Sequence, residues 1–113
     1  MPINAPLSID RIDQPGGPVL LRLRGELEVQ TGPMLRARLL DLMADRVPLV
    51  LDLRELVFLD SSGLAALLEL RSRARQAGWH VEMRGARGRV RELLERTGTL
   101  ALVESPGDLR SAT

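Results

Sequence analysis

Two adjacent serines, Ser61 and Ser62, are the side chains of this sequence whose position most clearly favours chemistry. An apolar run over residues 56–59 ends at Asp60, and Gly63 follows the serines, so we predict that a helix begins here with the serines at its N-cap. The N-terminus of a helix carries unpaired N–H groups and partial positive charge, and both stabilise an anion. A phosphate group on one serine would therefore be well placed to act as a switch. The alternative is that both hydroxyls only cap the helix.

A catalytic role for these serines has little support elsewhere in the sequence. A serine nucleophile needs a base within hydrogen-bonding reach, and the only imidazole is His80, which we predict on the surface near the start of a strand. No G-x-S-x-G pattern surrounds Ser61. One histidine and no cysteine leave few metal ligands. We therefore expect a protein that is not an enzyme, with no catalytic residues, no metal site and no cofactor; a serine nucleophile is the disfavoured alternative.

Two further polar segments could take part in binding. Glu26 and Glu28 interrupt the apolar alternation that precedes them, so we predict that both carboxylates lie on a loop. Residues 85–89 combine glycine with arginine ahead of a helix and could hold a phosphate, but they lack the lysine and hydroxyl of a phosphate-binding loop. We interpret this segment as an ordinary connection, and weak nucleotide binding stays an open alternative.

The composition of the chain narrows its class. A length of 113 residues suits one domain with its own core, and the absence of cysteine fits a reducing compartment. The sequence shows no secretion signal and no apolar run long enough to cross a membrane. A net charge of +1 and only two aromatic residues, Phe58 and Trp79, argue against nucleic-acid binding. We expect a soluble cytoplasmic protein with no direct nucleic-acid partner and no membrane contact.

The order of apolar patterns predicts an α/β fold. Strand-like alternation on both sides of the turn at residues 15–18 predicts a hairpin, and the apolar run at 49–53 predicts a central strand covered by helices on both faces. The predicted elements are strands at 7–12 and 19–24, a helix from a Thr31 cap to Asp45, a strand at 49–53, a helix from the serines to Gly78, a strand at 79–83, a helix with Val90, Leu93 and Leu94 that stops at Gly98, an edge strand at 100–103 and a frayed tail at 105–113.

Three ordered blocks of this sequence resemble the STAS domain family, and most closely its bacterial anti-sigma factor antagonists. Residues 21–28 end in G-E-L-E, close to the family's G-E-L-D, and Thr31 follows at the first helix. Residues 49–64 resemble the family's central strand and D-S-S-G-L segment. Residues 90–98 resemble its V-x-x-L-x-x-x-x-G third helix. The similarity spans about residues 7–104, and three blocks in order are far more specific than any one alone.

The resemblance implies a STAS-like single domain over residues 1–113, with a mixed sheet of about four to five strands, an N-terminal hairpin and three main helices. It implies phosphorylation at Ser61. The unphosphorylated protein would bind an anti-sigma factor serine kinase and release the sigma factor, phosphorylation would end this binding, and a metal-dependent serine phosphatase would restore it. The residues that the resemblance assigns to partner binding are Gly25, Glu26, Glu28, Thr31, Asp60, Ser61, Ser62, Gly63 and Leu64. Glu28 departs from the family's usual aspartate, which leaves the choice of partner open.

A second reading of the resemblance is an accessory STAS subunit of a lipid-transporting ABC system, or another STAS scaffold that is not phosphorylated. Those relatives also carry a hydroxyl after aspartate at the same helix start. We expect a monomer or a weak homodimer, and we predict exposed positions around Leu70 that could mediate association.

Overall fold

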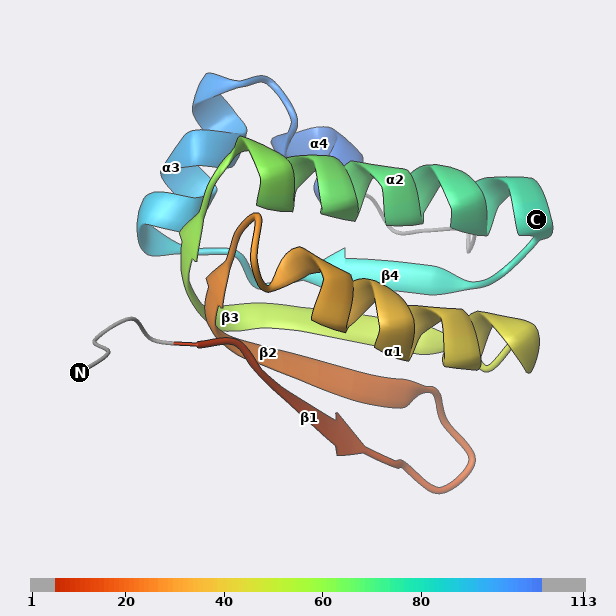
Figure 1. Ribbon diagram of the computed structural model, residues 1–113. Helices are drawn as coiled ribbons and strands as arrows, with labels where there is room; N and C mark the ends of the chain where they lie inside the picture. Colours follow the sequence, from red (N-terminus) through yellow and green to blue (C-terminus); the bar gives the residue numbers. More distant parts are fainter. Residues whose placement is uncertain (1–5, 105–113) are drawn as a thin grey trace.

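In the computed structural model, which describes residues 6–104, the chain forms four strands and four helices (Figure 1). The elements are β1 (Ser8–Ile12), β2 (Val19–Leu27), α1 (Gly32–Ala44), β3 (Leu49–Leu59), α2 (Ser61–Ala77), β4 (Val81–Arg84), α3 (Gly88–Arg96) and α4 (Leu100–Val103). None of the helices in this part of the chain is long and apolar enough to span a membrane. The frayed tail predicted at 105–113 lies outside the described residues.

The strands form one mixed sheet in the order β1-β2-β3-β4. The predicted hairpin is confirmed, because β1 pairs antiparallel with β2. β2 and β4 both pair parallel with β3, and α1 and α2 provide the crossovers between these parallel neighbours. The carboxyl ends of β2 and β3 therefore lie at the same edge of the sheet, where the chain turns into α1 and α2 (Figure 1).

Alternating leucines of the sheet and the inner faces of the helices form the core. Leu21 and Leu23 of β2 are buried, while Arg22 and Arg24 between them point to the other face. Trp79 is also buried, and its indole N–H donates to the Val47 carbonyl at 2.6 Å, which satisfies its polar group. The core thus holds α1 and α2 against one face of the sheet.

The central strand is buried as predicted, but charged side chains rather than helices occupy its second face. Residues 49–53 are all buried, and they include Asp52, whose exposed fraction is 3%. Arg54 donates to the Asp52 carboxylate from Nε and Nη2, and Arg22 on β2 approaches it to 3.6 Å. Arg22 Nε is buried and has no hydrogen-bond partner among the described residues, so it interacts with Asp52 as an ion pair over this longer distance.

The predicted edge strand at 100–103 is wrong, because these residues form helix α4. The Val103 and Leu102 N–H groups donate to the Thr99 carbonyl, and Val103 is fully buried. Arg71 of α2 donates to the carbonyls of Leu102 and Val81, which ties α4 to α2 and β4. A four-residue apolar run fits a strand or a helical turn equally well, so only these tertiary contacts decide its structure.

Leu70 is buried, so the prediction of exposed positions around it is wrong there. Its exposed fraction is 6%, and it faces α1 across the gap between the two helices. The helical period of α2 places Leu67, Leu70 and Ala74 on its inner face.

Asp52 retains its charge despite burial. Burial by itself raises the pKa of a carboxyl group, but hydrogen bonds from the Arg54 side chain and backbone, with the charges of Arg54 and Arg22, hold the pKa of Asp52 below its usual value. The carboxylate therefore stabilises the folded chain wherever it is ionised.

We expect the Asp52→Asn variant to lose about 2 kcal/mol of unfolding free energy at neutral pH, because the amide keeps the shape but not the charge that the two arginines face. Since folding lowers the Asp52 pKa, the ionised carboxylate stabilises above its unfolded pKa of about 3.9. This contribution declines as the pH falls below about 4 and through the lower folded value. Urea denaturation of both proteins at several pH values should show the difference narrowing toward acid.

Asp41→Asn is the matched control, because Asp41 is exposed on α1. Its unfolding free energy should change by less than about 0.5 kcal/mol at any pH. A loss in Asp52→Asn that stays constant into acid would contradict the role given to the Asp52 charge.

Candidate functional site

The N-cap of α2 is Asp60, so the prediction that the serines cap this helix is wrong by one residue. Asp60 has an extended backbone, and its Oδ1 accepts from the Gly63 N–H at 2.8 Å. Its carbonyl accepts from the Leu64 N–H at 2.9 Å. A carboxylate at this position satisfies one N–H and also complements the positive end of the helix dipole, which leaves the serine hydroxyls without a capping role.

Ser61 and Ser62 are the first two residues of α2, and both side chains are exposed. Within residues 6–104, the structure gives neither hydroxyl and neither backbone N–H of these two serines a hydrogen-bond partner. A hydroxyl here is open to a modifying enzyme, and a phosphate on it would lie beside unpaired N–H donors.

The turn between β2 and α1 is tied together by Glu28 and Thr31. Glu28 Oε1 accepts from the N–H groups of Gln30 and Thr31, at 2.8 and 3.1 Å. Thr31 Oγ1 accepts from the Glu28 N–H and donates to the Glu26 carbonyl. Thr31 is therefore at the N-cap position of α1 as predicted, but its side chain fastens the turn instead of capping the helix.

We predicted that Glu26 and Glu28 both lie on a loop, and this is confirmed only for Glu28. Glu26 lies within β2, where it pairs in register with Phe58 of β3. Burial along β2 alternates without a break to Leu27, and Gly25 takes an inward position where the sequence pattern expects an apolar side chain.

A close approach at Gly63 brings the two segments together. A Cβ at Gly63 would overlap the Leu27 carbonyl oxygen and crowd the Leu59 side chain, so only glycine fits between β2 and the first turn of α2. The Asp60 N–H also points to the Leu27 carbonyl, at 3.4 Å. Gly25 is buried with a φ of +107° against the Pro6 carbonyl. Buried Gly25 and Gly63 can therefore position the site but present no side chain to a partner.

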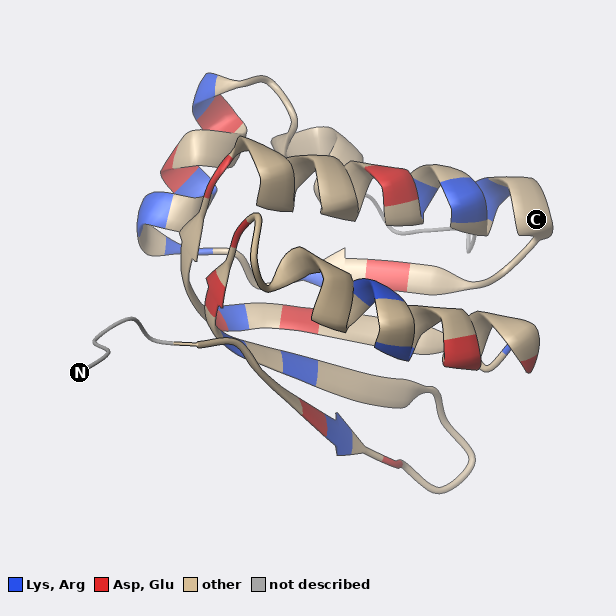
Figure 2. Cartoon of the chain, in the orientation of Figure 1, with Lys and Arg blue, Asp and Glu red and all other residues tan. Residues whose placement is uncertain are grey.

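The site is acidic. Glu26, Glu28 and Asp60 are each half-buried, and none of the ion pairs among residues 6–104 involves them. Figure 2 shows the acidic turn before α1 beside the acidic start of α2. This uncompensated negative charge opposes a further anion on the surface and favours a basic partner.

Exposed apolar side chains at this edge are the functional candidates that the sequence analysis missed. Val29 is 62% exposed, Val57 59% and Phe58 43%. A surface groove of about 350 Å³ between the N-terminal parts of α1 and α2 is lined by Glu28, Val29, Gly32, Pro33, Arg36, Ala37, Leu40, Ser62 and Ala66. The sequence indicated this surface only weakly. Val29 directly follows Glu28 in a turn, where a large apolar side chain cannot reach the core.

The structure offers no metal site in the part of the chain that it describes. No group of three or more His, Asp or Glu side chains could hold an ion there. Leu64, the last of the residues assigned to partner binding, is half-buried and packs against the core.

The sequence matches a family model described as Mlab, STAS domain, over residues 11–104. The crystal structure of an anti-sigma factor antagonist from Mycobacterium paratuberculosis is similar, with a TM-score of 0.74 and 27% identity over 91% of this chain and 88% of that chain. The anti-sigma factor antagonist SpoIIAA in its unphosphorylated form has a TM-score of 0.65 and 20% identity over 82% of this chain and 81% of its own.

SpoIIAA from Bacillus in its phosphorylated form has a TM-score of 0.61 and 18% identity, over 82% of this chain and 84% of that chain. Both SpoIIAA structures therefore show the fold that they share with this chain. No curated protein matches the sequence.

We expect Gly63→Ala to lower the unfolding free energy by about 2–3 kcal/mol, although alanine favours a helix more than glycine does. The added Cβ would meet the Leu27 carbonyl, a backbone atom that cannot rotate away. Urea denaturation measures the loss.

Gly32→Ala is the matched control, because Gly32 also lies in the first turn of a helix and a Cβ there meets nothing within 4 Å. Pro33 follows Gly32 and makes the helical backbone less favourable for alanine, so the unfolding free energy should change by less than about 1 kcal/mol in either direction. Equal stabilities for the two variants would show that the approach of α2 to β2 tolerates a methyl group.

Proposed function

Because the chain belongs to the STAS domain family, we propose that it is an anti-sigma factor antagonist whose docking surface is switched by phosphorylation of Ser61. In this proposal the unphosphorylated protein binds an anti-sigma factor serine kinase in the bacterial cytoplasm and so releases a sigma factor. The kinase then modifies Ser61, and a metal-dependent serine phosphatase reverses the modification. The chain acts by binding rather than as an enzyme, as a monomer or weak homodimer. The likeness to the mycobacterial antagonist supports the general role.

The observation that carries the proposal is the exposed Ser61 hydroxyl at the first residue of α2, beside three carboxylates that form no ion pair within residues 6–104. A phosphate would add about 1.5 to 2 negative charges next to Asp60 and near Glu26 and Glu28. A docked partner would then face this charge and lose the hydration of the phosphate. The unpaired N–H groups of α2 can hold the anion, so the surface changes while the fold does not.

The proposed docking surface combines acidic and apolar groups. Ser61, Ser62 and Val29 are exposed, and the half-buried carboxylates of Glu26 and Glu28 lie beside them. Such a surface suits a partner that carries a basic rim around an apolar contact. Thr31 and the two buried glycines contribute by fixing the turn and the start of α2.

Ser61 is the expected site of modification. Incubation with an anti-sigma factor serine kinase and ATP should add one phosphate to Ser61, and Ser61→Ala should abolish it, because no other hydroxyl has the same position at the start of α2. Mass spectrometry of the digested protein locates the phosphate.

Ser62→Ala is the control, since it removes the neighbouring exposed hydroxyl and keeps Asp60 as the cap. It should be phosphorylated like the wild type. Phosphate that persists in Ser61→Ala would assign the modification to a different residue and overturn the role of Ser61.

A negative charge at position 61 is expected to lower the affinity for the kinase. Ser61→Asp should weaken binding to the kinase about a hundredfold, which corresponds to about 3 kcal/mol. Docking removes water from the added carboxylate and from Asp60 beside it, which costs hydration and strengthens the repulsion between the two charges. Isothermal calorimetry measures the affinity. Ser61→Asn has the same size without the charge and should stay within about fivefold of the wild type. Equal losses for both variants would indicate a steric rather than an electrostatic switch.

An accessory subunit of a lipid-transporting ABC system, or another scaffold that is not phosphorylated, is the second candidate function. The matching family model is described as Mlab as well as STAS domain, so the accessory subunit is tested together with the antagonist. Capture of the tagged protein from its own cells separates the two candidates. An anti-sigma factor kinase as the main partner supports the antagonist, and a transporter ATPase supports the accessory subunit.

A further inference from the structure

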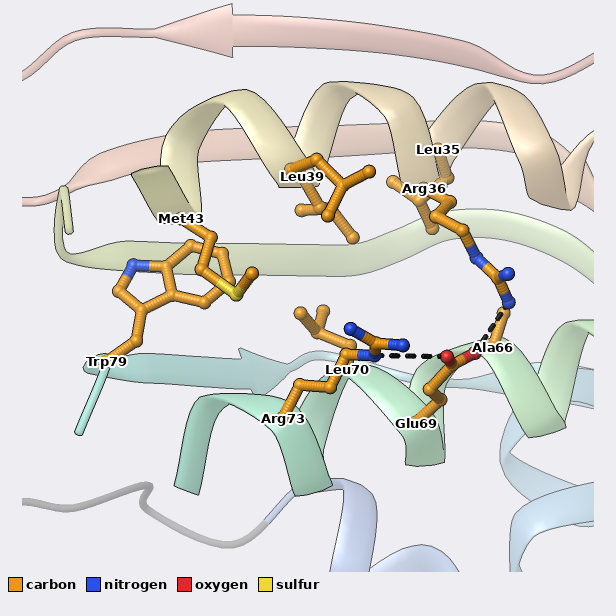
Figure 3. A pocket seen from close by; sticks show the side chains of 10 residues that line it. Leu35, Arg36, Leu39, Met43, Ala66, Glu69, Leu70, Arg73 and Trp79 are labelled. Carbon is orange, nitrogen blue, oxygen red and sulfur yellow. Dashed lines mark hydrogen bonds and ion pairs between the residues drawn. The ribbon is translucent and has the colours of Figure 1, made fainter. Parts of the chain in front are cut away.

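An apolar cavity of about 120 Å³ lies between the middle of α1 and α2 (Figure 3). It adjoins the groove beside Ser62, with which it shares Arg36, Leu40 and Ala66, but Ser61 does not line it. Its apolar walls are formed by Leu35, Leu39, Met43, Ala66, Leu70 and Trp79. Trp79 and Met43 stand together at one end, and the small Ala66 side chain leaves space at the other (Figure 3). The two helices therefore enclose an apolar space that their own side chains do not fill.

Three charged residues border this cavity. Glu69 of α2 receives two guanidinium groups: Arg36 of α1 donates from Nη2 to Glu69 Oε1 at 2.5 Å, and Arg73 donates from Nε to Glu69 Oε2 at 3.1 Å. These are the charged residues among those that line the cavity, and together they carry a net charge of +1. Figure 3 shows Arg36 and Glu69 bridging the two helices beside the apolar walls.

One carboxylate shared by two guanidiniums leaves N–H donors on both arginines available to a second anion. Arg36 and Arg73 side chains are 58% and 57% exposed, so an anionic group can reach them from solvent. A planar guanidinium pairs well with a carboxylate. The rim therefore complements an anion, and the walls complement an alkyl chain.

The size of the cavity sets the size of its occupant. An apolar cavity of about 150 Å³ is large enough to hold benzene. A cavity of 120 Å³ thus matches an alkyl chain of about four to six carbons.

We propose that the cavity between α1 and α2 binds a small anionic amphiphile, with its short aliphatic tail against Leu39, Leu70 and Trp79 and its carboxylate paired with Arg36 and Arg73. Binding is noncovalent and needs no modification of Ser61.

Trp79 provides the measurement, because it is the only tryptophan of the chain and forms one wall of the cavity. Its fluorescence is recorded while butanoate, hexanoate and octanoate are added to the full-length protein. We expect a saturable change, with affinity rising about fourfold for each added methylene until the cavity is full. Hexan-1-ol, which has the same tail without the charge, should bind several times more weakly than hexanoate.

Variants on the two sides of α2 test the location. Ala66→Leu fills the cavity and should abolish binding of hexanoate, whereas Ala65→Leu adds the same side chain at an exposed position and should not. Arg73→Gln should weaken hexanoate about fivefold and leave hexan-1-ol unchanged. If Ala66→Leu fails to fold by circular dichroism, amide chemical shifts of the wild type with hexanoate show whether Leu39 and Leu70 respond.

Any of three results would overturn the proposal. A tryptophan signal that rises without saturation, or amide shifts elsewhere on the surface, would show nonspecific partitioning. Equal affinity for hexanoate and hexan-1-ol would remove the role of the arginines. Hexanoate can bind even if Ser61 is not phosphorylated, and Ser61 can be phosphorylated even if hexanoate does not bind. The two proposals are therefore tested separately.

Discussion

The contact between Gly63 and the Leu27 carbonyl is the constraint on which the site depends. It allows the first turn of α2 to lie directly against the end of β2, which a side chain at position 63 would prevent. Asp60 then caps the helix and points its own N–H to the same carbonyl. Because β2 and β3 are parallel neighbours, this single close approach brings the turn before α1 and the start of α2 to one edge of the sheet.

The carboxylates at this edge have no ion pair among the described residues, in contrast to Asp52 and Glu69. Asp52 on the open face of the sheet is neutralised by Arg22 and Arg54, and Glu69 serves two arginines between the helices. Glu26, Glu28 and Asp60 have no such ion pair among the described residues. Arginines therefore neutralise the carboxylates on the open face of the sheet and between α1 and α2, whereas the edge beside Ser61 stays negative and can respond to one more charge.

The sequence was sufficient to predict the elements whose pattern is strong, and insufficient where tertiary contacts decide. The hairpin, the buried run at 49–53 and the long α2 follow from periodicity, and the comparison with known proteins confirms the family. The structure of 100–103 could not be predicted, because it depends on Arg71 reaching carbonyls far along the chain. The Asp60 cap was misplaced because serine and aspartate are equally good N-caps, and only the backbone conformation distinguishes them.

The geometry also constrains how a phosphate at Ser61 could act. α2 is held at its start by Gly63 against β2, along its length by buried leucines and at its side by Glu69 paired with Arg36 of α1. A helix fixed at three places cannot move far in response to one added group without breaking core contacts. A phosphate on Ser61 would then change the hydration of the surface and its affinity for a partner, and would leave the position of α2 unchanged. We therefore expect the proposed switch to be electrostatic, with the fold as its rigid support.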